Sequence, residues 1–177
     1  MKKVILAIGM PGSGKSTLLR DFSIRHSYSY ISPDDIRQEL TGDAGDQSAN
    51  EEVWRRAFER LSAAMQNSET VVFDSTMYKL VDRQDAIARS RDFGASQVEG
   101  VYFMAPYAVV EERNARRHRI VPETAMLRMH EALTLYPPSV LDGFDSLFVI
   151  DTNRAFEETK RELEMCFLKP EFAHTIH

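Results

Sequence analysis

The sequence predicts an α/β fold in which a central parallel β-sheet of about five strands is flanked by helices. Five short apolar runs are nearly continuous rather than alternating, which is typical of strands buried on both faces. Segments with helical spacing separate the runs, and this alternation indicates βαβ units with right-handed crossovers. In addition, a glycine-rich segment joins the first run to the first helical segment.

The apolar runs are expected to form strands at residues 4–8, 28–31, 71–73, 101–103 and 147–150. Ser48-Ala49-Asn50-Glu51 predicts a capping box that opens a helix. Further helices are expected at residues 79–93, 106–117, 122–133 and 154–167, with loops at 41–50 and 136–146. Because no repeat or linker interrupts this pattern, we expect one domain over residues 1–177.

The composition excludes several classes of protein. With 43% hydrophobic and 28% charged residues, the chain is not disordered. Its single cysteine, Cys166, excludes an intrachain disulfide and fits a reducing compartment. No apolar run approaches the roughly 20 residues of a membrane helix, so we expect a cytoplasmic protein without membrane contact. The net charge of −5 argues against a broad basic face for nucleic acid.

Residues 9–17 fit the phosphate-loop pattern G-x-x-x-x-G-K-[ST]. Glycines let backbone N–H groups turn toward phosphate oxygens, and the following helix adds its positive N-terminal end. Lys15 is expected to reach the β- and γ-phosphates of a nucleoside triphosphate, and the Ser16 hydroxyl to ligate Mg²⁺. The expected nucleotide-binding residues are Gly9, Pro11, Gly12, Ser13, Gly14, Lys15, Ser16 and Thr17.

Acidic residues follow the second and third expected strands. Ser32 suits the N-cap of a helix, with Asp35 as the acid that completes the cap. Asp34 then remains to accept the proton of an attacking hydroxyl, and Arg37, on the same helix face, to position an anionic acceptor. The alternative is that both acids only complement the helix dipole. Asp74 ends the third run and is expected to help hold Mg²⁺, unless it caps the following turn.

Four arginines lie between residues 113 and 119, at the junction of two expected helices. We expect a mobile lid over about residues 113–122 that closes over the phosphates and supplies an arginine to the transition state. The spacing places Arg113, Arg116 and Arg117 near one face and Arg119 off it. The alternative is a solvated basic face. By contrast, Trp54 and Phe58 recur at helical spacing and are expected to be core residues rather than a base-stacking platform.

In their order these motifs resemble those of the polynucleotide 5′-hydroxyl kinases, in particular the kinase domain of phage-type polynucleotide kinase-phosphatases. The resemblance extends from Lys3 to about Asp151 and implies a P-loop kinase fold. It also implies transfer of the γ-phosphate of ATP, with Mg²⁺, to the 5′-hydroxyl end of RNA or DNA. It rests on the phosphate loop, Asp34-Asp35-Ile36-Arg37-Gln38, Asp74-Ser75-Thr76 and Arg113-Asn114-x-x-Arg117.

The same resemblance implies roles for individual residues. Asp34 would be the general base, and Arg37 would contact the 3′-phosphate of the acceptor or the scissile phosphate. A lid arginine, Arg116 or Arg117, would steady the transition state, and Arg113 is expected to bind the nucleotide. No obligate protein partner is expected.

Two alternatives share these motifs. Small-molecule kinases of the same superfamily, which phosphorylate shikimate, gluconate, antibiotics or nucleotide sugars, also resemble this sequence, and the acidic composition favours them. The second alternative is a nucleotide-binding regulatory protein that hydrolyses ATP without an acceptor. Against it, the lid arginines are supplied by the chain itself.

Overall fold

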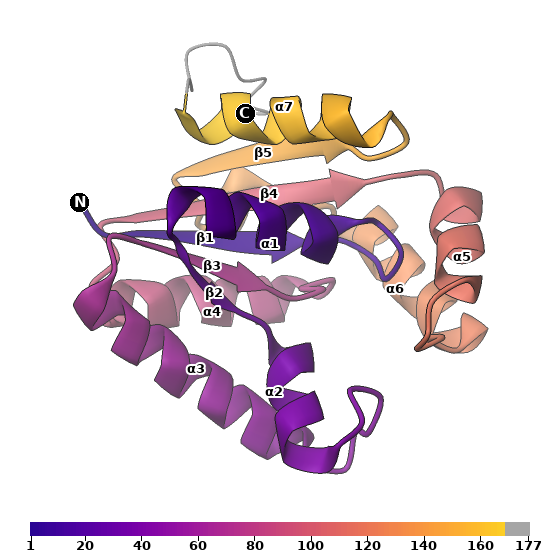
Figure 1. The fold of residues 1–177 in the computed structure, drawn as a ribbon, viewed down its shortest axis with the longest axis horizontal. Helices are drawn as coiled ribbons and strands as arrows, with labels where there is room; N and C mark the ends of the chain where they lie inside the picture. The colour runs from indigo at the N-terminus through magenta and orange to yellow at the C-terminus, as the bar shows by residue number, and fades with distance from the viewer. Residues whose placement is uncertain (169–177) are drawn as a thin grey trace.

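A computed structural model describes the protein over residues 1–168. Its centre is a sheet of five parallel strands in the order β2-β3-β1-β4-β5 (Figure 1). The predicted α/β fold with a central parallel sheet is therefore confirmed. The strands are β1 (Lys3–Ile8), β2 (Ser29–Ile31), β3 (Thr70–Asp74), β4 (Gln97–Met104) and β5 (Ser146–Asp151).

The helices predicted from the sequence are present, and their ends differ from the expected ones by no more than two residues. The expected loop at 136–146 contains a short 3-10 helix, η1 (Val140–Asp142), which Ser139 caps. The α-helices of the described residues are α1 (Lys15–His26), α2 (Pro33–Thr41), α3 (Asn50–Asn67), α4 (Leu80–Asp92), α5 (Tyr107–Ala115), α6 (Glu123–Leu135) and α7 (Phe156–Leu168).

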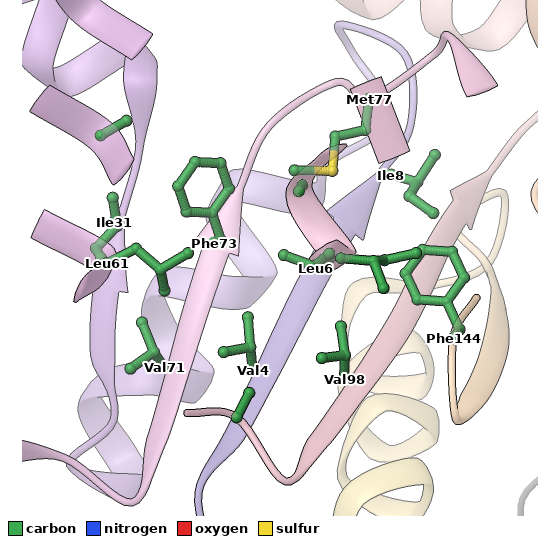
Figure 2. Packing of buried hydrophobic residues seen from close by; sticks show 14 of the residues in the cluster. Val4, Leu6, Ile8, Ile31, Leu61, Val71, Phe73, Met77, Val98 and Phe144 are labelled. Atoms are coloured by element: carbon green, nitrogen blue, oxygen red, sulfur yellow. The ribbon is translucent and has the colours of Figure 1, made fainter. Parts of the chain in front are cut away.

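Helices cover both faces of the sheet (Figure 1). On one face, α1 and α7 pack over Ile5 and Ala7 of β1. On the other, α3 and α4 pack over Val4, Leu6 and Ile8, and Figure 2 shows these three side chains among their neighbours from β3, α3 and β4. Successive residues of a strand point to opposite faces. Both faces of β1 are buried, which explains why its sequence is continuously apolar.

The order of the strands brings the polar residues that follow β1, β2 and β3 to one edge of the sheet. β1 pairs with β3 so that Ala7 lies opposite Asp74, and β2 pairs with β3 so that Ile31 lies opposite Phe73. The Gly9 N–H donates to the carbonyl of Thr76 at 3.1 Å, which ties the phosphate loop to the segment after β3. Ligands of open α/β sheets bind at this carboxyl edge, where the strand order reverses.

One predicted helix cap is wrong, and a second is only partly right. The N-cap of α3 is Ala49, without a side-chain bond, because the Ser48 N–H instead donates to Asp46 Oδ1 at 2.8 Å within a local turn. Ser32 does cap α2, since its Oγ accepts from the Asp35 N–H. The Asp35 carboxylate, however, accepts from Arg20 Nη2 of α1 at 2.5 and 2.7 Å rather than completing the cap. The ion pair with α1 has replaced the local bond.

Two further observations concern membrane-spanning helices and the single cysteine. No helix of the described residues is both long and apolar enough to cross a lipid bilayer. Cys166 is buried between α7 and the sheet, and burial raises the pKa of its thiol to about 12. The thiol therefore stays protonated at neutral pH.

Candidate active site

The phosphate loop depends on glycines at defined places. Gly9, Gly12 and Gly14 have φ angles of 152°, 86° and 83°, which favour glycine over any residue with a side chain. A Cβ on Gly12 would lie 2.4 Å from the carbonyl oxygen of Val110 in α5, so the two backbones are in direct contact. The root of the arginine-rich segment is thereby held against the phosphate loop.

Lys15 and Ser16 begin α1, where backbone N–H groups and the helix dipole favour a bound phosphate. Burial lowers the pKa of Lys15, and the negative charges of Asp74 and Asp34 act against this shift. The positive charges of Arg117 and Arg119 lower the same pKa further. Four charged side chains, two acidic and two basic, therefore act on the ammonium of Lys15. Of the other residues predicted to bind nucleotide, Pro11 lines the cavity described next, Ser13 is buried, and Thr17 is exposed on α1.

A cavity of about 1170 Å³ opens at the phosphate loop. It runs between α3 and α4 on one side and is bounded by the segment between α5 and α6 on another. Eight Lys and Arg residues line it against six Asp and Glu residues, although acids outnumber bases 27 to 22 in the whole chain. The cavity is thus locally suited to anionic ligands. Among the sequence-predicted residues that line it are Pro11, Lys15, Ser16, Asp34, Arg37, Asp74 and Arg117.

Asp74 lines this cavity and is 4% exposed. Its Oδ2 accepts from the Tyr30 hydroxyl at 2.6 Å, and burial together with the Asp74 charge raises the pKa of that hydroxyl. Its Oδ1 is buried without a hydrogen-bond partner among the described residues. One oxygen is therefore oriented by Tyr30 and the other is available to a cation. No cluster of three acidic, His or Cys ligands occurs in residues 1–168. A carboxylate oxygen such as Asp74 Oδ1 is a ligand type that suits Mg²⁺, which protein sites often bind through one or two carboxylates together with phosphates.

Asp34 and Arg37 lie one turn apart on α2 and are in contact, as their spacing predicted. Arg37 Nη1 donates to Asp34 Oδ1 at 2.6 Å, and Arg37 Nη2 donates to Asn50 Oδ1 of α3 at 3.0 Å. Arg37 is 5% exposed, whereas the Asp34 side chain is 53% exposed and faces the cavity. The buried arginine therefore holds the exposed carboxylate in place, and its Nε is left without a partner among the described residues.

The four arginines between residues 113 and 119 divide differently from the expectation. Arg119, expected off the common face, lines the cavity and places Nη1 3.1 Å from Asp34 Oδ2. Arg117 also lines the cavity. Arg116 does not: its side chain is 77% exposed and pairs with Glu112 one turn back on α5. Arg113 Nη2 donates to the carbonyl of Thr152, beyond β5. The α-helix ends at Ala115, so helical spacing no longer governs the residues after it.

Two residues that organise the cavity were given no role from the sequence, although Asn114 belongs to one of the motifs. Arg83 of α4 is fully buried; it pairs with Asp142 at 2.6 Å and donates to the carbonyls of Met77 and Tyr78 in the cavity wall. Asn114 is buried and makes two bonds to Val121, one to its carbonyl at 2.9 Å and one from its N–H at 3.1 Å. Arg83 occupies a position on the buried face of α4 with Ala86, Ile87 and Ser90, and this spacing was the available signal.

The prediction that Trp54 and Phe58 are core residues is only partly right. Both are half-buried and line the cavity, with one side packed against the fully buried Phe73 of β3. Leu61, one turn further along α3, is fully buried. The face of α3 that carries these residues therefore lies in the core at Leu61 and borders the cavity at Trp54 and Phe58, nearer the N-terminus of the helix.

The parallel sheet, the phosphate loop and the charged cavity together define a P-loop phosphotransferase, that is, a kinase. The family model described as "AAA domain" matches residues 4–136, and the chain belongs to this family.

Several solved structures are similar to the protein in fold. A sugar kinase from Janibacter sp. HTCC2649 is 16% identical, with coverage of 95% of each chain and a TM-score of 0.67. A gluconokinase from Sinorhizobium meliloti 1021 is 20% identical over 96% of this chain and 94% of that one, with a TM-score of 0.64. A chain of the Pnkp1/Rnl/Hen1 RNA repair complex is 23% identical over 81% of this chain but 46% of its own length, with a TM-score of 0.68.

Proposed function

We propose that this kinase transfers the γ-phosphate of ATP to the 5′-hydroxyl end of RNA or DNA. The observation that carries the proposal is the position of Asp34. Its exposed carboxylate faces the same cavity as Lys15, is held by Arg37 and Arg119, and acts on the charge of Lys15. A hydroxyl that enters between Asp34 and the phosphate loop meets a proton acceptor on one side and the phosphate donor on the other.

In the proposed reaction each of these residues has one task. Asp34 takes the proton of the acceptor hydroxyl as its oxygen bonds to the γ-phosphorus, and the bond from that phosphorus to the bridging oxygen of ADP breaks. Lys15 and the loop N–H groups neutralise charge on the phosphates. Arg117, on a lid formed by about residues 113–122, neutralises charge on the transferred group. Ser16 and Asp74 would hold Mg²⁺, which would supply positive charge to the phosphate oxygens.

The shape of the cavity supports an elongated acceptor. Its wall includes Glu51, Trp54, Phe58 and Ser62, which recur along one face of α3. At 1.5 Å per residue, this face extends for roughly 16 Å. A monosaccharide fills only the part beside Asp34, whereas an oligonucleotide end continues along the helix. The fold similarity to a chain of an RNA repair complex agrees with this choice.

A small-molecule kinase is the second candidate, and a specific observation favours it. The sugar kinase and the gluconokinase match nearly their whole length to nearly the whole of this chain. The acids in the cavity, such as Glu59 and Asp85, would also accept hydrogen bonds from sugar hydroxyls.

A transfer assay with γ-labelled ATP and Mg²⁺ tests the proposal. The acceptors are a 5′-hydroxyl RNA, a 5′-hydroxyl DNA, gluconate, a panel of sugars and none. Label on an oligonucleotide is the expected result, and label on a sugar alone would replace the proposal with the second candidate. Asp34→Asn is expected to reduce transfer by at least about 10²-fold, because general-base catalysis contributes that much or more. Binding of ATP is expected to remain.

Asp35→Asn is the matched control for Asp34→Asn. It makes the same chemical change at the next residue of α2, but the Asp35 carboxylate pairs with Arg20 outside the cavity. We expect this variant to keep the wild-type transfer rate within a few-fold. If both variants lost activity equally, the loss would reflect the stability of α2, and the assignment of Asp34 as the base would be contradicted.

A further inference from the structure

Trp54 differs from the other aromatic residues of the cavity in what surrounds its ring. Its ring centroid lies 6.2 Å from that of Phe73, with an angle of 26° between the planes, and 5.9 Å from that of Phe58. Phe73 is fully buried in β3, so a rigid part of the sheet supports the indole from behind. Trp54 is nevertheless half-buried only and lines the cavity. A supported aromatic ring thus borders the acceptor side of the site.

Phe58 shares this support but is already covered. The guanidinium of Arg89 lies 4.6 Å from its ring centroid, and Arg89 is in turn held by Asp85 at 2.8 Å. Within residues 1–168, no Lys or Arg stacks on Trp54 in this way. Of the two cavity aromatics on α3, Trp54 is therefore the one whose ring is available to a planar ligand.

The position of Trp54 relative to Asp34 fits a nucleoside. Arg37 joins Asp34 to Asn50, and Trp54 follows Asn50 by four residues on the same face of α3. One helical turn, about 6 Å along the axis, separates Asn50 from Trp54. In a nucleoside, a single ribose separates the 5′-hydroxyl from the base. A nucleoside with its 5′-hydroxyl at Asp34 and its base one helical turn beyond Asn50 would place that base at the indole.

We infer that Trp54 is a stacking platform for the nucleobase of the 5′-terminal nucleotide of the acceptor. This inference rests on the proposed function and adds a base-recognition subsite to it. Stacking on an aromatic ring accepts any base, because every base has a π-face. The subsite therefore selects a nucleotide end over a sugar without selecting a sequence.

The chain contains one tryptophan, so the indole can be observed directly. Intrinsic fluorescence is measured during titration with a short 5′-hydroxyl oligonucleotide, in the absence of ATP. A matched oligonucleotide whose 5′-terminal residue is abasic serves as the comparison. We expect strong quenching by the first and little by the second. Equal quenching, or none with either, would contradict the inference.

Transfer kinetics give the second measurement. For the wild-type enzyme we expect kcat/KM to be about tenfold higher with the base-bearing acceptor than with the abasic one, the effect of one stacked base. Trp54→Leu removes the π-system and should abolish this difference, while Trp54→Phe should restore part of it. Phe58→Leu loses a neighbouring aromatic of the same wall but should keep the difference, which separates stacking from the packing of α3.

The outcomes distinguish the inference from the proposed function. If neither oligonucleotide is phosphorylated, the proposed function fails. If both are phosphorylated with equal efficiency by the wild type and by Trp54→Leu, the function stands and the stacking subsite is wrong. Thermal melting of each variant reports its folding, and the abasic acceptor provides an activity reference within every variant.

Discussion

The phosphate loop and the segment of residues 116–122 face each other across the cavity, but different interactions hold them. The loop follows a strand that is buried on both faces, and its glycines have φ angles that favour glycine. The Arg116 and Arg117 N–H groups donate to the carbonyls of Arg113 and Asn114 at the end of α5. Beyond this turn, the polar contacts of the 116–122 segment include the bonds of the Asn114 side chain to Val121 and the ion pair of Arg119 with Asp34. The donor side of the site is thus fixed by backbone and sheet, whereas the opposite side depends on a few side chains.

This difference suggests how each side responds to mutation. Changes on the donor side should remove chemistry without altering the position of the surrounding residues. Changes in the 116–122 segment should alter position and chemistry together. The variants below test that contrast.

The largest effect is expected for Lys15→Ala. We expect transfer to fall by about 10³-fold, at the upper end of the loss from one group that stabilises transition-state charge. Burial lowers the pKa of Lys15, but its positive charge also compensates the buried Asp74; the two effects oppose each other, so we expect only a small change in the melting temperature. Steady-state kinetics and thermal melting check both statements. Transfer near the wild-type rate would refute the phosphate-loop assignment itself.

A smaller effect is expected for Arg117→Ala, about 10²-fold in kcat/KM. Arg117 lines the cavity and its charge acts on Lys15, but its side chain is exposed to solvent, which weakens its field. Arg116→Ala is the matched control, because Arg116 pairs with Glu112 and does not line the cavity. It should change kcat/KM by less than twofold. The reverse ranking would mean that the segment rearranges when substrates bind.

The same contrast explains which features could be predicted from the sequence. The sheet and the phosphate loop follow from patterns within a few residues, such as the apolar run of β1 and the glycines at 9, 12 and 14. Asp74 follows from its position at the end of a strand. The contact between Asp34 and Arg119 joins residues 85 positions apart, and no local pattern encodes it. The helical spacing that placed Arg116 in the site ends with α5 at Ala115.

Local competition accounts for the other differences. Ser48 is a residue type suited to a helix cap, but its N–H donates to Asp46 rather than to the acid that would complete a capping box. Asp35 is suited to a cap as well, yet Arg20 of α1 reaches it once the helices pack. Trp54 has the spacing of a core residue, and only the position of α3 at the cavity exposes its ring. For Ser48 and Asp35, the residue type suits a helix cap, but a partner in the same turn or on another helix takes the hydrogen bond. For Trp54, the spacing is that of a core residue, but the position of α3 determines how much of the ring is exposed.

Apart from the control variants, the smallest effect on rate is expected for Asn114→Ala, which tests how the 116–122 segment is held. The change removes both bonds to Val121 and leaves a backbone N–H and a carbonyl without partners, a loss of about 1–3 kcal/mol. Because Asn114 lies at the root of the segment, the loss should fall on its order as well as on global stability. We expect kcat/KM to fall by up to about tenfold, and amide exchange to accelerate from Arg116 to Val121 but not in the phosphate loop. Uniformly faster exchange in both regions would show that the two sides are held together, which contradicts the contrast from which the prediction starts.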